Sequence, residues 1–128
     1  ARTFDLLPDV PAGKVVVSVV NALRFGKSGA IAEQDLPGGS CAHRIQELAP
    51  EANVVVAYNN LPAAGLQARH HLDADVLVCG KSRAAREAVI ELTSSIPGTR
   101  ALDINLNRRY GGEASLSISG LESAPARP

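Results

Sequence analysis

Residues 75–103 read DVLVCGKSRAAREAVIELTSSIPGTRALD, and this stretch decides the fold class. The run from Asp75 to Cys79 is apolar and stops at a glycine, as a buried strand does. Ser82 can cap a helix in which apolar side chains recur at spacings of four, three and four residues, namely Ala85, Val89, Leu92 and Ile96. A Pro-Gly pair ends that helix, and residues 99–102 form another short strand. The stretch therefore predicts a strand–helix–strand unit.

The preceding part of the chain repeats this alternation. KVVVSVV at 14–20 and VVVAY at 54–58 are nearly continuous apolar runs, which are typical of strands buried on both faces. Between them we expect a loop over residues 21–39, and then a short helix that starts after Ser40 and ends before Pro50. Residues 62–72 form a short helix or loop. Alternating strands and helices predict an α/β fold with a mostly parallel sheet.

Composition excludes several classes of function. The chain has 128 residues, one domain's worth, with 13 basic and 13 acidic side chains and only 3% aromatic residues. That balance argues against nucleic-acid binding, and no apolar run approaches the roughly 18 residues that span a bilayer. We expect a soluble, cytoplasmic protein that binds no metal. Cys79 is interpreted as an ordinary buried thiol. Cys41 follows the expected helix start, which can lower a thiol pKa, but we expect no special role for it.

Two predicted strands end in amides. Asn21 follows the first strand, and Asn59 and Asn60 follow the second. In open parallel sheets, ligands bind beyond the carboxyl ends of the strands. Neutral amides, which offer donors and acceptors together, suit the edge of a flat neutral heterocycle. The alternative is that these asparagines form Asx turns that redirect the chain. The residues alone leave both interpretations open.

Four segments together resemble one family. They are AGKVVVSVVNALRF, VVVAYNNLPAAGL, the stretch over residues 75–103, and INLNRRYGGEASLSISG. In this order they resemble the NADPH-dependent coenzyme F420 reductases, over about residues 11–121. The most specific pieces are VVNALRF, AYNNLPA and DVLVCG.

The resemblance implies a Rossmann-like parallel sheet flanked by helices, present here as its second half, with a small C-terminal strand extension. It implies an NADP-binding domain over residues 1–103, an extension near a deazaflavin pocket over 104–121, and a disordered tail over 122–128. The implied activity is hydride transfer between NADP(H) and coenzyme F420, in which the cofactors carry the chemistry and no catalytic side chain is needed. The implied cofactor-binding residues are Asn21, Ala22, Leu23, Asn59, Asn60, Leu61, Pro62, Ala63, Ala114 and Ser115.

The chain also departs from the family. The Gly-x-Gly-x-x-Gly fingerprint is absent, and FGKSGA at 25–30 holds only two glycines and is interpreted as a false match. We therefore expect a C-terminal fragment, or a chain with segments missing from the sequence, whose valine strands present an open edge. That edge predicts a homo-oligomer or association with the missing N-terminal half. Two alternatives remain: an NADP-dependent reductase with another acceptor, and a non-catalytic Rossmann-like module that associates through the open edge.

Overall fold

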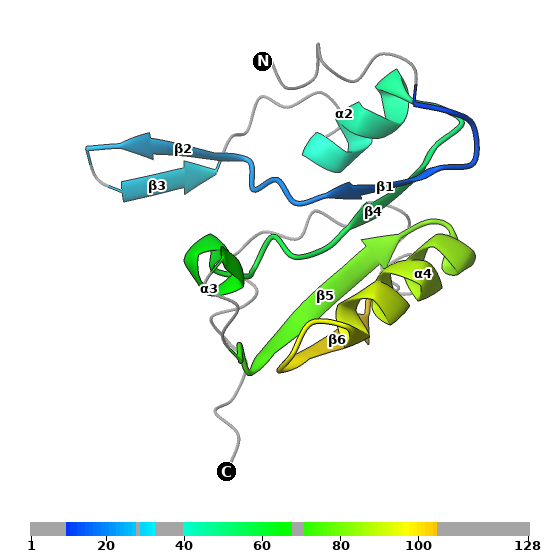
Figure 1. The fold of residues 1–128 in the computed structure, drawn as a ribbon. Helices are drawn as coiled ribbons and strands as arrows, with labels where there is room; N and C mark the ends of the chain where they lie inside the picture. The colour runs from blue at the N-terminus through cyan, green and yellow to red at the C-terminus, as the bar shows by residue number, and fades with distance from the viewer. Residues whose placement is uncertain (1–9, 28, 33–39, 68–70, 105–128) are drawn as a thin grey trace.

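A computed structural model describes residues 10–27, 29–32, 40–67 and 71–104. The elements follow in the order β1 Val15–Ser18, β2 Leu23–Gly26, β3 Gly29–Ala32, α2 Cys41–Leu48, β4 Asn53–Val56, α3 Ala63–Gln67, β5 Ala74–Gly80, α4 Arg83–Ser94 and β6 Thr99–Asp103 (Figure 1). Strands and helices alternate as the sequence predicts, so the α/β class is confirmed.

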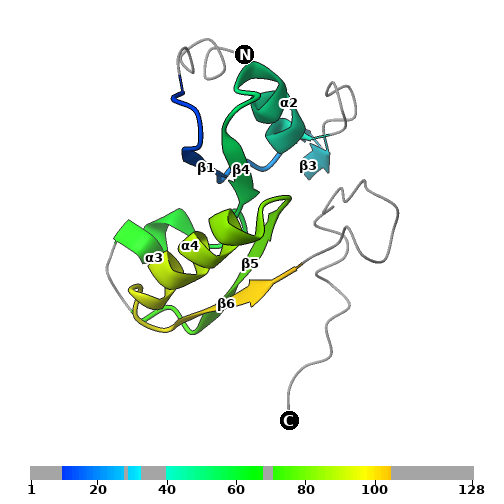
Figure 2. The same cartoon turned by 90° about the vertical axis from the view of Figure 1, so that its right-hand side faces the viewer.

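The core lies between the sheet and α4. Val55 of β4 and Val76 and Val78 of β5 are fully buried, and they pack with Ala85 and Val89 of α4. Helix α2 covers the other face of the sheet, on the opposite side from α4 (Figure 2). Because successive side chains of a strand point to opposite faces, each of these short valine runs supplies apolar side chains to both faces of the sheet.

Both predicted helix caps are present. The Ser40 hydroxyl accepts the N–H of His43 at 3.1 Å at the start of α2, and the Ser82 hydroxyl accepts the N–H of Ala85 at 3.2 Å at the start of α4. Each bond satisfies a backbone donor that the first turn of a helix leaves without a partner.

The predicted apolar stripe of α4 is wrong at one position. Leu92 is 55% exposed, whereas Thr93 is fully buried. The buried stripe follows spacings of four, through Ala85, Val89 and Thr93. Threonine is tolerated there because its hydroxyl donates to the carbonyl of Val89 at 2.7 Å, so that no polar hydrogen is left without a partner.

The predicted parallel sheet is correct for two of three neighbouring pairs. The strand order is β1-β4-β5-β6, with β1 parallel to β4 and β5 parallel to β6. The central pair, β4 and β5, is antiparallel. A parallel connection needs a crossover that packs on the sheet, usually a helix. Helix α3, between these strands, has five residues and buries none of them, so it cannot serve as that helix.

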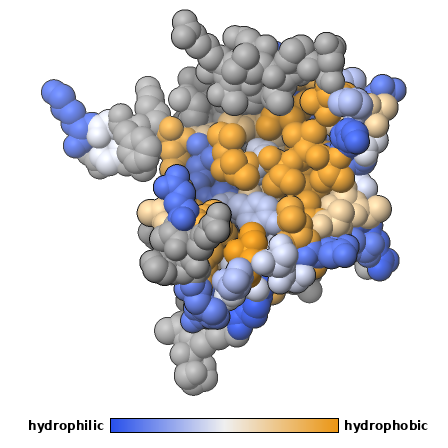
Figure 3. All heavy atoms as spheres, in the orientation of Figure 1, coloured by the Kyte–Doolittle hydropathy of each residue, from blue (hydrophilic) through white to orange (hydrophobic). Residues whose placement is uncertain are grey.

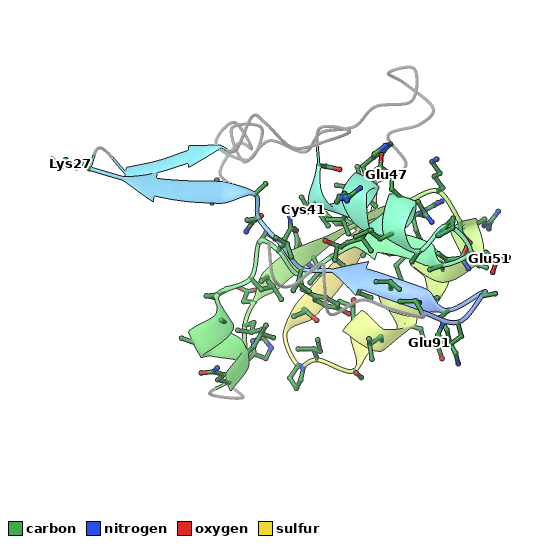
Figure 4. All side chains as sticks on the ribbon, turned by 90° about the horizontal axis from the view of Figure 1, so that it is seen from above. Lys27, Cys41, Glu47, Glu51 and Glu91 are labelled. Atoms are coloured by element: carbon green, nitrogen blue, oxygen red, sulfur yellow. The ribbon has the colours of Figure 1, made fainter. Side chains whose placement is uncertain are left out.

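The predicted loop over residues 21–39 contains a hairpin instead. Strands β2 and β3 pair antiparallel, with Gly26 opposite Gly29 at the turn. The hairpin projects from the sheet with Lys27 at its tip (Figure 4). FGKSGA therefore closes a hairpin and opens no helix, which confirms that it is no phosphate-binding fingerprint. Within the described ranges, no helix is long and apolar enough to cross a membrane.

Val55→Ala tests the core. Val55 is fully buried between the sheet and α4. Removing two methyl groups there should lower the free energy of unfolding by about 2 kcal/mol, through lost burial and the cavity left behind. Leu92→Ala on the outer side of α4 is the control and should change it by less than about 0.5 kcal/mol. Denaturant unfolding of the complete protein measures both, and equal losses would contradict this core.

Candidate functional site

The reversal between β4 and β5 brings three strand ends to one edge of the sheet. Strands β1 and β4 run parallel and both end there. Strand β5 runs the opposite way and therefore begins there. We call this edge, with the chain that leaves β1 and β4 and enters β5, the amide edge, because the three predicted asparagines lie on it.

Asn21 and Asn59 bind each other at the amide edge. The Nδ2 of Asn21 donates to the backbone carbonyl of Asn59 at 2.6 Å, and the Nδ2 of Asn59 donates to the Oδ1 of Asn21 at 3.2 Å. The two residues are 38 positions apart in the chain. The pair joins the exit of β1 to the exit of β4, and it brings together the VVNALRF and AYNNLPA motifs that the sequence singled out.

Asn60 makes a different connection. Its Nδ2 donates to the backbone carbonyl of Asp75 at 2.7 Å, which ties the exit of β4 to the entry of β5. The Asp75 carboxylate accepts from Arg100 of the neighbouring strand, at 2.7 Å from Nε and 2.6 Å from Nη2. The charges of Asp75 and Arg100 are therefore paired with each other, and the amide groups beside them are neutral.

The donors of these asparagines do not form the predicted Asx turns. An Asx turn bonds a side chain to backbone two residues away, whereas these amides reach partners 38 and 15 residues away. They are connections between segments. Among the described residues, the Oδ1 atoms of Asn59 and Asn60 accept no hydrogen bond, since only their Nδ2 atoms are used.

The other predicted residues lie around the same edge. Ala22 and Leu23 are half-buried where the chain turns from β1 into β2. Leu61 packs against the core, and the Pro62 carbonyl accepts the N–H groups of Gly65 and Leu66 at the start of α3. Pro62 and Ala63 are exposed. Ala114 and Ser115, with the predicted extension and tail, lie outside the described residues.

The opposite edge holds a buried cation that the sequence reading missed. Arg86 is only 4% exposed, and it donates to the Asp103 carboxylate and to the Gly80 carbonyl, each at 2.7 Å. Its neighbour Cys79 is not a reactive thiolate: burial raises the pKa of that thiol, and Asp103 adds to this, while Arg86 acts in the opposite direction. The sequence did hold a signal for this burial: Arg86 precedes Val89 by three residues, and residues three apart lie on the same side of a helix.

The remaining candidate residues among those described, Cys41 and His43, do not form a functional site. Burial raises the pKa of the Cys41 thiol, so the start of α2 does not make it reactive. His43 lies 3.5 Å from Glu47 on the exposed side of that helix. Within the described ranges, no group of three or more histidine, cysteine, aspartate or glutamate side chains could hold a metal ion.

Comparison with known proteins shows which proteins this chain is similar to. No protein-family model matches the chain. An F420-dependent NADP reductase of Methanocaldococcus jannaschii is 35% identical over 107 residues, which cover 79% of this chain and 46% of that protein. The chain is a homologue of that protein. It spans about half the length of the relatives that it matches.

Two solved structures share this fold. A candidate F420-dependent NADP reductase from Arthrobacter sp. FB24 superposes with a TM-score of 0.58 at 28% identity, over 77% of this chain and 47% of that one. A hypothetical protein from Sinorhizobium meliloti superposes with a TM-score of 0.62 at 31% identity, over 78% of this chain and 49% of that one. The α/β sheet described here is therefore part of the Rossmann-like fold of these structures.

Asn60→Leu tests the connection between β4 and β5. Leucine keeps a similar volume but leaves the Asp75 carbonyl without its donor, so unfolding should become easier by about 1 kcal/mol. Gln67→Leu is the matched control, because Gln67 is exposed on α3 and makes no hydrogen bond among the described residues. Thermal and denaturant unfolding measure both variants. If the two variants are equally stable, the amide does not hold the strands together.

Proposed function

We propose that this chain forms part of an oxidoreductase that transfers hydride between NADP(H) and the deazaflavin coenzyme F420. The observation that carries the proposal is the reciprocal Asn21–Asn59 pair. It joins two motifs of a chain whose homologue in Methanocaldococcus jannaschii is named an F420-dependent NADP reductase. The pair lies at the carboxyl ends of two parallel strands, where open α/β sheets bind their ligands.

The residues present fit the ring portions of these cofactors. A nicotinamide carboxamide and the pyrimidine-like edge of a deazaflavin both offer N–H donors, and the Oδ1 atoms of Asn59 and Asn60 can accept from them. The described residues do not supply a pyrophosphate turn at FGKSGA, since that stretch is the β2–β3 hairpin. Other residues must therefore hold the phosphates.

The role of this chain in the reaction is alignment. The dihydronicotinamide supplies the hydride and the deazaflavin accepts it, so the protein has no bond of its own to make. Neutral amides orient a ring without placing a charge beside the carbon that gives up hydride. The Asn21–Asn59 pair fixes the exit of β4, and Leu61, anchored in the core, holds the next turn. Misplacing a reacting group by about 1 Å can cost on the order of 100-fold in rate.

A second function is supported by the edge of the sheet. Among the described residues, β1 pairs only with β4. Val15, Val19 and Val20 are 40%, 56% and 43% exposed, and apolar side chains gather over β1 and toward α4 on the surface in Figure 3. Large apolar patches of this kind mark interaction surfaces. The alternative function is a non-catalytic Rossmann-like module that associates through β1, either with a second copy or with a further part of the same protein.

Hydride transfer can be followed directly. In the complete protein, NADPH carrying deuterium at the transferable position should reduce F420 and deliver the label to it, with loss of the absorbance of the oxidised deazaflavin. Asn59→Leu should lower the single-turnover rate by about 100-fold, since it removes the side-chain bond to Asn21 Oδ1 and a ligand acceptor. Asn53→Leu, which removes an amide at the other end of β4, is the control and should keep the rate. Absence of labelled product with the wild-type protein would overturn the proposal.

The alternative has its own test. Val19→Lys places a charge on the exposed apolar surface and should weaken any association through β1, as seen by sedimentation at several protein concentrations. An assembly that Val19→Lys disperses, in a protein that transfers no hydride, would favour the module. Unchanged sedimentation would mean that β1 is not an interface between chains.

A further inference from the structure

Tyr58 has an unusual backbone conformation for its side chain. It lies between the end of β4 and the amides Asn59 and Asn60, and its φ is 62°. Bulky residues rarely adopt positive φ, because Cβ then crowds the neighbouring carbonyl, so the surrounding structure must hold the residue there. Asp73, just before β5, also has a positive φ, of 42°. Both ends of the β4–β5 connection are therefore tightly fixed.

The Tyr58 side chain supplies one of the contacts that hold it. Its ring packs against the core, and its hydroxyl lies 2.9 Å from the Thr93 hydroxyl. Thr93 donates its only hydroxyl proton to the Val89 carbonyl at 2.7 Å. The Tyr58 hydroxyl also lies 3.5 Å from the Val89 carbonyl, so the two hydroxyls and this carbonyl form one hydrogen-bonded group that joins Tyr58 to the last turns of α4.

From these contacts we infer that Tyr58 is the positioning residue of the amide edge, an inference that rests on the function proposed above. The left-handed turn at Tyr58 lets consecutive amides reach different segments, Asn59 toward Asn21 and Asn60 toward Asp75. The bond to Thr93 fixes that turn to α4. Tyr58 thus acts on the cofactor rings through the amides, without touching the rings itself.

Tyr58→Phe is the decisive variant, because it keeps the ring and removes only the hydroxyl, with its contacts to the Thr93 hydroxyl and the Val89 carbonyl. The Leu61 N–H donates to the Tyr58 carbonyl at 3.1 Å, so its amide exchange reports opening of the turn. In the complete protein, Tyr58→Phe should speed Leu61 exchange and slow single-turnover hydride transfer, each by about fivefold to tenfold, as expected for one buried hydrogen bond. The KM for NADPH should change less than kcat.

Companion variants separate positioning from general stability. Thr93→Val should reproduce both effects, the double variant should be no worse than either single one, and Thr93→Ser should restore both rates. The matched control is Thr99→Val, since the Thr99 hydroxyl bonds the carbonyls of Thr93 and Ile96 but no residue of the amide edge. It should leave Leu61 exchange and hydride transfer within about twofold of wild type, whatever it does to the melting temperature.

The outcomes are distinct. If the amide exchange rate of Leu61 is unchanged in Tyr58→Phe, the positioning role is overturned even if the enzyme is active. The same holds if Thr99→Val changes that exchange rate as much as Tyr58→Phe does. Faster exchange with an unchanged hydride-transfer rate overturns it as well, because the turn would then not govern the reaction. A wild-type protein that transfers no hydride overturns the proposed function, while Leu61 exchange still decides whether Tyr58 holds the turn.

Discussion

The reversal of chain direction after β4 is the constraint on which the rest of the structure depends. Strands β4 and β5 are joined by two residue pairs, Val55 with Gly80 and Val56 with Cys79. So short a ladder cannot by itself hold the two parallel halves of the sheet in register. The core valines and α4 supply the apolar part of the joint, and the polar bonds of Asn60 and Tyr58 supply the rest. The same groups that close the sheet therefore define the candidate site.

Local signals in the sequence predicted the elements well. The caps at Ser40 and Ser82, the apolar runs of β1, β4 and β5 and the helix over α4 depend on neighbours a few residues away. The direction of β5, in contrast, does not depend on neighbouring residues in the sequence. Parallel and antiparallel pairing can use the same buried valine run, and only the connection reveals which is used. The hairpin β2–β3 was missed because a Gly-Lys-Ser-Gly turn resembles an ordinary polar loop.

The candidate site was only partly predictable, for the same reason. The amides at 21, 59 and 60 stand out because they follow apolar runs, and their meeting at one edge follows from the parallel pairing of β1 with β4. Their partners could not be predicted. Asn60, four residues beyond the end of β4, reaches Asp75 because β5 runs antiparallel to β4, which reverses the expected direction. Tyr58 looked like the last residue of a strand, and nothing local marks it as left-handed.

The two edges of the sheet differ in charge, and this difference bears on chemistry. Arg86 and Asp103 form a partly buried ion pair at the end of β5 and β6, where the guanidinium also binds the backbone. Removing either partner would leave a charge without compensation, so that edge is suited to holding structure. At the amide edge the charges of Asp75 and Arg100 are paired, and the acceptors left over belong to neutral amides. Hydride moves with its electron pair, and a fixed unpaired charge near its path would bias one oxidation state of the ring over the other. Under the function proposed above, the neutral amide acceptors would orient the ring without that bias.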